Sequence, residues 1–124
     1  ALSGYKNLKI LADLKGRIGK NEIIETLQRV GLNPKMKKPV SKYSLGMRQR
    51  LGIAQAIMEN PDVLILDEPF KGLDVTTKQI VMQYVKEKTA GKTTFLVTHD
   101  AVEADFFGGN RWTLPTENKN ANDE

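Results

Sequence analysis

The sequence predicts an α/β fold, a helical subdomain followed by a parallel-sheet core, on three observations. The first half of the 124 residues carries apolar side chains at helical spacing. The unbroken apolar run Val63-Leu64-Ile65-Leu66 ends in two acids, as a buried parallel strand does. A helical segment separates this run from a β-branched run at Thr93 to Thr98, and the order strand, helix, strand is typical of a parallel sheet with a right-handed crossover.

Three helices are expected before the first strand. The apolar stripes of the first two are formed by Leu8, Leu11, Leu14 and Ile18, and by Ile23, Ile24, Leu27 and Val30. Asn21 is a suitable N-cap for the second helix, and Gly31 followed by Pro34 ends it. Ser44 caps a third helix, which continues until Pro61.

The second half alternates strands and helices. The strand at 63–66 is expected to be buried on both faces, because its apolar run is unbroken. Asp74 caps the next helix, and Gly91 closes it. The residues that this helix turns inward are Ile80, Val81, Tyr84 and Val85. A short helix at 101–107 and a candidate edge strand at 111–114 follow the second strand.

The composition is that of an ordinary globular chain, since 40% of the residues are hydrophobic and 27% are charged. No apolar run approaches the roughly 20 residues of a transmembrane helix, so any membrane link is expected through a partner. The absence of cysteine excludes disulfides and thiolate metal sites. Basic residues cluster only at Lys35, Lys37 and Lys38, without an aromatic platform, so no nucleic-acid partner is expected despite the net charge of +4.

Asp67 and Glu68 come directly after the first strand, at the carboxyl end where open α/β sheets bind ligands. Consecutive strand residues face opposite ways, so the two carboxylates can take different tasks. Asp67 can hold Mg²⁺ through its water shell, and Glu68 can lie beside an attacking water. The alternative is an acidic pair that only caps the following turn.

The acidic pair becomes a specific signal when the other motifs of the sequence are considered with it. The segments that accompany it, in chain order, are Tyr43-Ser44-Leu45-Gly46-Met47-Arg48-Gln49-Arg50, Leu66-Asp67-Glu68-Pro69, Gly72-Leu73-Asp74 and Thr98-His99-Asp100. They resemble the signature, Walker B, D-loop and histidine elements of the ATP-binding cassette (ABC) family. The resemblance implies a P-loop NTPase with a helical subdomain at 1–60, a partial nucleotide-binding core at 61–114 and a flexible tail at 115–124.

The resemblance also implies roles for single residues. The implied catalytic residues are Glu68 and His99, the metal-binding residue is Asp67, and the nucleotide-binding residues are Ser44, Gly46 and Asp74. A serine at a helix start presents its hydroxyl and free N–H groups to an anion, and Gly46 allows close approach. The alternatives are an ordinary capped helix after Ser44 and a structural role for His99.

The phosphate-binding Walker A loop has no match in the sequence. The nearest segment is Gly91-Lys92-Thr93, but Lys86 stands where the first glycine belongs and a strand follows in place of a helix. In the family this loop precedes the helical subdomain, so the chain resembles a cassette truncated at its front. We expect such a segment to be inactive alone and to form a homo-oligomer through its exposed strand edges.

For the complete protein, the resemblance implies ATP hydrolysis with Mg²⁺ at two composite sites shared with a second nucleotide-binding subunit. Transmembrane transporter subunits are the other expected partners, which places the protein in the cytoplasm at the inner face of the membrane. Leu45 and Met47 depart from the common glycine and glutamine of the signature, and this variant resembles those of bacterial drug or peptide exporters. The alternatives are a non-catalytic binding or regulatory module and a cassette ATPase acting on ribosomes or DNA.

Overall fold

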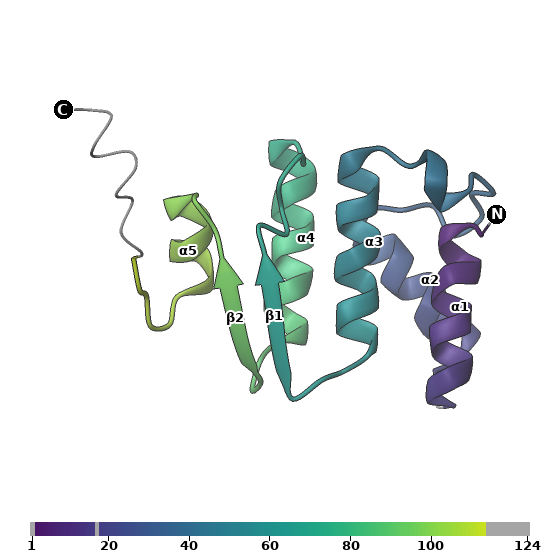
Figure 1. The fold of residues 1–124 in the computed structure, drawn as a ribbon, viewed down its shortest axis with the longest axis horizontal. Coiled ribbons are helices and arrows are strands. Elements are labelled where there is room, and N and C mark those ends of the chain that lie inside the picture. Colours follow the sequence, from purple (N-terminus) through teal and green to yellow (C-terminus); the bar gives the residue numbers. More distant parts are fainter. Residues whose placement is uncertain (1, 17, 114–124) are drawn as a thin grey trace.

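The structure, a computed structural model, describes residues 2–16 and 18–113 and places a group of helices beside a two-stranded parallel sheet (Figure 1). The elements are α1 (Gly4–Lys15), α2 (Lys20–Arg29), the 3₁₀ helix η1 (Val40–Lys42), α3 (Leu45–Met58), β1 (Val63–Asp67), α4 (Val75–Lys88), β2 (Thr93–Val97) and α5 (Ala101–Phe107). The predicted α/β fold is therefore confirmed. Residues 111–113 form no strand, and the rest of the candidate edge strand and the predicted tail lie outside the described residues.

Side-chain caps determine where several helices begin. The Ser44 hydroxyl accepts a hydrogen bond from the Met47 amide at 3.1 Å, and the Asp74 carboxylate accepts one from the Thr77 amide at 2.7 Å. Both caps were predicted, because these side chains satisfy N–H groups that have no partner in the first turn. The prediction for Asn21 is wrong, since α2 begins after Gly19, whose lack of a side chain leaves the start without a side-chain cap.

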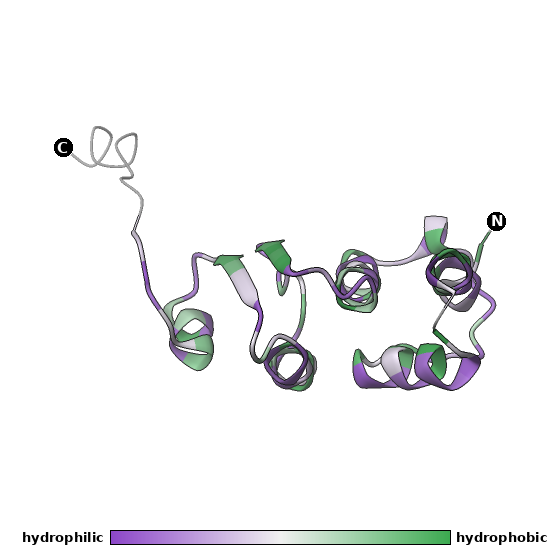
Figure 2. Ribbon diagram, turned by 90° about the horizontal axis from the view of Figure 1, so that it is seen from below, coloured by the Kyte–Doolittle hydropathy of each residue, from purple (hydrophilic) through white to green (hydrophobic). Residues whose placement is uncertain are grey.

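The two strands pair in parallel, from Val63 opposite Thr93 to Asp67 opposite Val97. Figure 2 shows α4 and α5 on the same side of the two strands. The opposite face exposes four large apolar side chains, at fractions of 52% for Val63, 68% for Ile65, 46% for Phe95 and 45% for Val97. The prediction that β1 is buried on both faces is therefore wrong for the described chain, because helices cover only one face.

The buried side chains form two clusters. The larger cluster joins α1, α2 and α3 with one residue of α4, and its members are Leu8, Ala12, Ile23, Leu27, Val30, Leu32, Tyr43, Leu51, Ala54, Met58 and Tyr84. The second cluster lies between the sheet and α4, and its members are Ile53, Leu64, Leu66, Phe70, Val81, Met82 and Val85. Leu14 and Ile80, which were predicted to face inward, are 82% and 52% exposed because they lie beside the buried stripe of their helix.

Candidate functional site

Both strands end at the same edge of the molecule, where α3, α4 and α5 begin (Figure 1). Carboxyl ends of parallel strands are the usual ligand-binding edge of α/β folds, and helix N termini add a positive potential there. Asp67 is the last residue of β1, and Glu68 follows it. This edge brings together most of the site residues that the sequence predicts.

Glu68 adopts a left-handed backbone conformation, with a φ of 48°. Its amide donates to the Val97 carbonyl at 2.8 Å, and its own carbonyl accepts from the Gln49 side chain at 3.1 Å. A residue with a side chain adopts this conformation only at a cost, so the surrounding contacts have to hold it. The left-handed turn directly follows the last residue of the strand.

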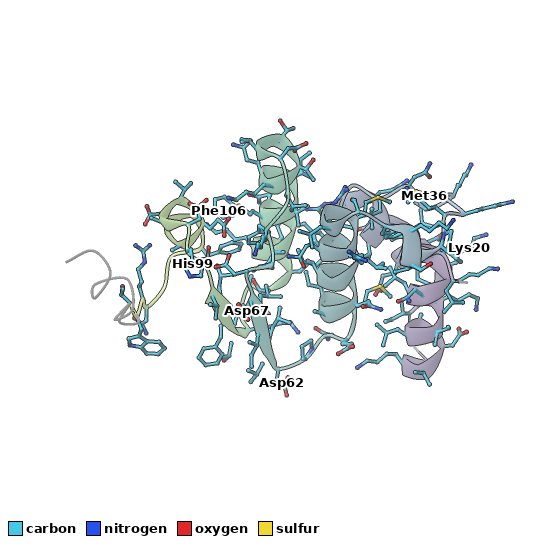
Figure 3. All side chains as sticks on the ribbon, turned by 45° about the horizontal axis from the view of Figure 1, so that its top comes forward. Lys20, Met36, Asp62, Asp67, His99 and Phe106 are labelled. Carbon is cyan, nitrogen blue, oxygen red and sulfur yellow. The ribbon has the colours of Figure 1, made fainter. Side chains whose placement is uncertain are left out.

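His99 lies just beyond β2, and its Nδ1 contacts Oε1 of Glu68. The imidazole is 91% exposed, whereas the Glu68 side chain is 30% exposed. Figure 3 shows His99 beside the sheet, at the end of the molecule far from Lys20 and Met36. A carboxylate that can accept a proton and an imidazole that can orient a water molecule are thus in contact, as the sequence predicts for neighbouring strand ends.

Asp67 is exposed, and its side chain makes no hydrogen bond or ion pair within the described part of the chain. A free carboxylate at a strand end suits Mg²⁺, which takes one or two carboxylates and completes its shell with water and phosphate oxygens. Among the described residues, no three acidic, histidine or cysteine side chains gather into a metal site. Asp67 therefore fits as a single protein ligand, with the remaining ligands supplied from outside these residues.

Ser44 and Gly46 lie at the start of α3. The Ser44 side chain is exposed while its hydroxyl caps the helix. A Cβ atom placed on Gly46 would lie 3.1 Å from the Gly72 carbonyl oxygen and 3.3 Å from a methyl group of Leu73. The missing side chain thus lets α3 pack against the loop that leads to α4, a packing role that the sequence prediction of anion approach did not include.

Asp74 ends that loop and caps α4. Hydrogen bonds from the backbone and the hydroxyl of Thr77 lower the pKa of its carboxyl. The carboxylate is therefore ionised, and it accepts the hydrogen bond that caps α4. Asp74 is exposed and lies at the same edge of the molecule as Gly46, because the loop at Gly72 packs against the start of α3.

Sequence reasoning missed the residues that support the site. Gln49 holds the carbonyl of Glu68, and Lys78 and Glu103 contact the residues on either side of His99. Gln49 lay within the quoted motif without a role of its own. An acid at position 103, surrounded by apolar residues of a short helix, was the signal for a buried charge.

Comparisons with known proteins give consistent matches. A protein-family model described as ABC transporter matches residues 4–71. The bacitracin transport ATP-binding protein BcrA of Enterococcus faecalis is 45% identical over 100 residues, which are 79% of this chain and 32% of that protein. The lantibiotic transport ATP-binding protein SrtF of Streptococcus pyogenes is 39% identical over 112 residues, which are 86% of this chain and 48% of that protein.

The similar solved structures include the dimeric post-hydrolysis state of the ATP-binding cassette MJ0796 bound to ADP and Pi. It superposes with a TM-score of 0.72 at 29% identity, over 85% of this chain and 49% of that chain. The chain thus spans about a third to a half of the length of the proteins that it matches.

Proposed function

Since this chain belongs to the ABC transporter family, we propose that its full-length protein is the ATPase subunit of a transporter that exports a peptide antibiotic or a similar drug. The observation that carries the proposal is the contact between Glu68 and His99 at the edge where Asp67 offers a free carboxylate. The names of the bacitracin and lantibiotic transport proteins support the class of substrate.

The chemistry assigned to these residues is hydrolysis of ATP. Glu68 accepts a proton from the attacking water, and His99 holds that water or the terminal phosphate in line. Asp67 would hold Mg²⁺, which neutralises phosphate charge when it is bound. The left-handed turn at Glu68 fixes the position of the base before the substrate arrives, so little reorganisation is needed.

A second nucleotide-binding subunit completes the proposed site. The start of α3, with Ser44 and Gly46, offers free N–H groups and a hydroxyl to the phosphates of ATP held by the other subunit. Asp74 ends the loop that packs against Gly46, so in this proposal it moves together with the start of α3. The dimeric state of the similar structure with ADP and Pi supports this arrangement.

The remaining partners follow from the division of the chain. We assign residues 1–60 to a subdomain that docks on transmembrane transporter subunits, and residues 61–114 to the nucleotide-binding core. No helix within 2–16 and 18–113 is both long enough and apolar enough to cross a membrane. Because the docking partners lie in the membrane, the proposal includes a location in the cytoplasm at its inner face.

The uncovered face of the sheet supports a proposal about the 124-residue chain itself. Val63, Ile65 and Phe95 expose apolar surface beside strand edges, and such surfaces associate with other chains. Alone, the chain is proposed to be inactive and to form a homo-oligomer. A monomer in light scattering would refute the proposed homo-oligomer.

The test is steady-state ATPase activity of the full-length protein carrying Glu68→Gln. Loss of a general base lowers turnover by about 10²- to 10⁴-fold, while nucleotide binding measured by calorimetry is retained. The matched control is Glu87→Gln in α4, because Glu87 pairs with Arg29 on the helical side of the molecule. Equal activities of the two variants would overturn the role of Glu68.

The same preparation separates the alternative functions. An intact protein that binds but does not hydrolyse ATP would indicate the non-catalytic module. ATP-dependent substrate uptake into inverted membrane vesicles supports the transporter, and ATPase activity stimulated only by ribosomes or DNA would refute it.

A further inference from the structure

Glu103 of α5 is the one charged residue that is buried within residues 2–16 and 18–113, with 5% of its surface exposed. Its Oε1 accepts a hydrogen bond from the Thr98 hydroxyl at 2.6 Å, and its Oε2 forms an ion pair with the ammonium group of Lys78. A buried carboxylate needs such partners, because ionising it without them is very unfavourable. The positions of Thr98 and Lys78 are therefore tied to that of Glu103.

The same contacts hold both neighbours of His99. The Thr98 hydroxyl accepts from the Asp100 amide at 3.0 Å, and the Asp100 carboxylate accepts from Lys78 at 2.8 Å. The imidazole of His99 is 91% exposed and contacts the carboxylate of Glu68. Its direction is thus set mainly by the backbone on either side of it, which these contacts immobilise.

Lys78 connects this cluster to a second part of the site. It lies in the first turn of α4, where its amide donates to the Asp74 carbonyl at 2.8 Å. The hydrogen bond to Asp100, and to a smaller extent the one to Glu103, raises the pKa of the Lys78 ammonium group, so this group stays charged at neutral pH. A shift of the loop that ends at Asp74 would therefore move Lys78, and with it the segment around His99.

We propose that Lys78 and Glu103 are positioning residues, which hold the backbone at Thr98 and Asp100 so that His99 stays within reach of Glu68 and follows the movements of Asp74. Neither side chain touches the substrate in this proposal. It rests on the proposed function, because it acts through His99.

The competing explanation is that the cluster only fastens α4 to α5. The structure offers a matched control for this, since Lys86 also joins the two helices, through a hydrogen bond of 2.9 Å to the Phe106 carbonyl, but at the end of α4 far along the chain from Asp74. A purely structural tether would make Lys78→Met and Lys86→Met similar in every assay.

The experiment measures kcat and KM for ATP in the full-length protein. Lys78→Met is expected to lower kcat by about 10- to 100-fold, the scale of a misplaced catalytic group, with little change in KM. Lys78→Arg should restore most of the loss, and Lys86→Met should leave both constants unchanged. Glu103→Gln keeps the side-chain volume and an oxygen acceptor for Thr98. Like Lys78→Met, it should lower kcat, without unfolding α4 and α5.

A double mutant decides whether the effect passes through His99. On a His99→Ala background, Lys78→Met should cause no further loss of kcat, because the two changes remove the same contribution. Additive losses, or a kcat for Lys78→Met equal to that of Lys86→Met, would overturn the proposal. If His99→Ala itself retains full turnover, the proposed function of the histidine fails instead, so the two failures are distinguishable.

Discussion

Replacing Glu68 by glycine and by alanine separates the backbone of the site from its chemistry. The residue has a φ of 48°, in the left-handed region that glycine adopts freely and other residues avoid. Both variants lose the carboxylate and its contact with His99, so this loss cancels when the two are compared. The remaining difference is the cost of placing a Cβ atom in the left-handed conformation.

The size of that difference follows from two opposing contributions. The left-handed conformation costs a residue with a side chain roughly 1–2 kcal/mol. Glycine loses about 0.5–1 kcal/mol more backbone entropy on folding. We therefore expect Glu68→Gly to be more stable than Glu68→Ala by about 0.5–1 kcal/mol, although both variants are expected to lose activity under the proposed function.

The assay is urea unfolding of the two full-length variants, with the free energies compared at equal slope. Gln83, exposed in the middle of α4, provides the control, because glycine in a helix interior is less stable than alanine by about 1 kcal/mol. The sign should thus reverse between positions 68 and 83. Greater stability of the alanine variant at both positions would refute the reasoning about strain at Glu68.

Three further predictions concern packing and pH. Gly46→Ala should destabilise the protein by about 1–3 kcal/mol through overpacking, whereas Gly52→Ala, which meets no atom within 4 Å, should not; thermal melts of both variants test this. The hydrogen bond from Lys78 lowers the pKa of Asp100, so its stabilising contribution is present above about pH 4 and is lost in acid; Asp100→Asn should flatten the acid limb of the stability curve. Burial raises the pKa of Tyr84, so stability should fall as the pH rises above about 10, and Tyr84→Phe should remove that fall.

Local signals in the sequence predicted the elements whose ends are determined by nearby side chains. The helix at 101–107 was found with its bounds, because Asp100 caps its start and Gly108 ends it with a φ of 70°. Ser44 and Asp74 were found as caps for the same reason. Asn21 failed because asparagine is also tolerated in the first turn, and only the structure shows that the chain enters α2 through Gly19.

Features that depend on a neighbouring layer could not be read from the sequence. The apolar run of β1 correctly predicted a strand but not that one of its faces stays open, since Val63 and Ile65 look the same in either case. The contact between Glu68 and His99 could be anticipated because each residue follows a strand of the parallel pair, whereas the roles assigned to the site residues stay predictions. The contacts of Gln49 and Lys78 could not be predicted from the sequence, because both side chains bind residues at least nineteen positions away.

The two buried clusters share two helices, and this determines how the fold comes apart. Leu51 of α3 and Tyr84 of α4 belong to the helical cluster, while Ile53 and Val81 of the same helices belong to the cluster under the sheet. Neither half can melt without exposing apolar surface of the other, so their unfolding is cooperative. Backbone amides in the middle of α3 and α4 should accordingly exchange with deuterium only when the whole unit opens, later than those of α1 or α5.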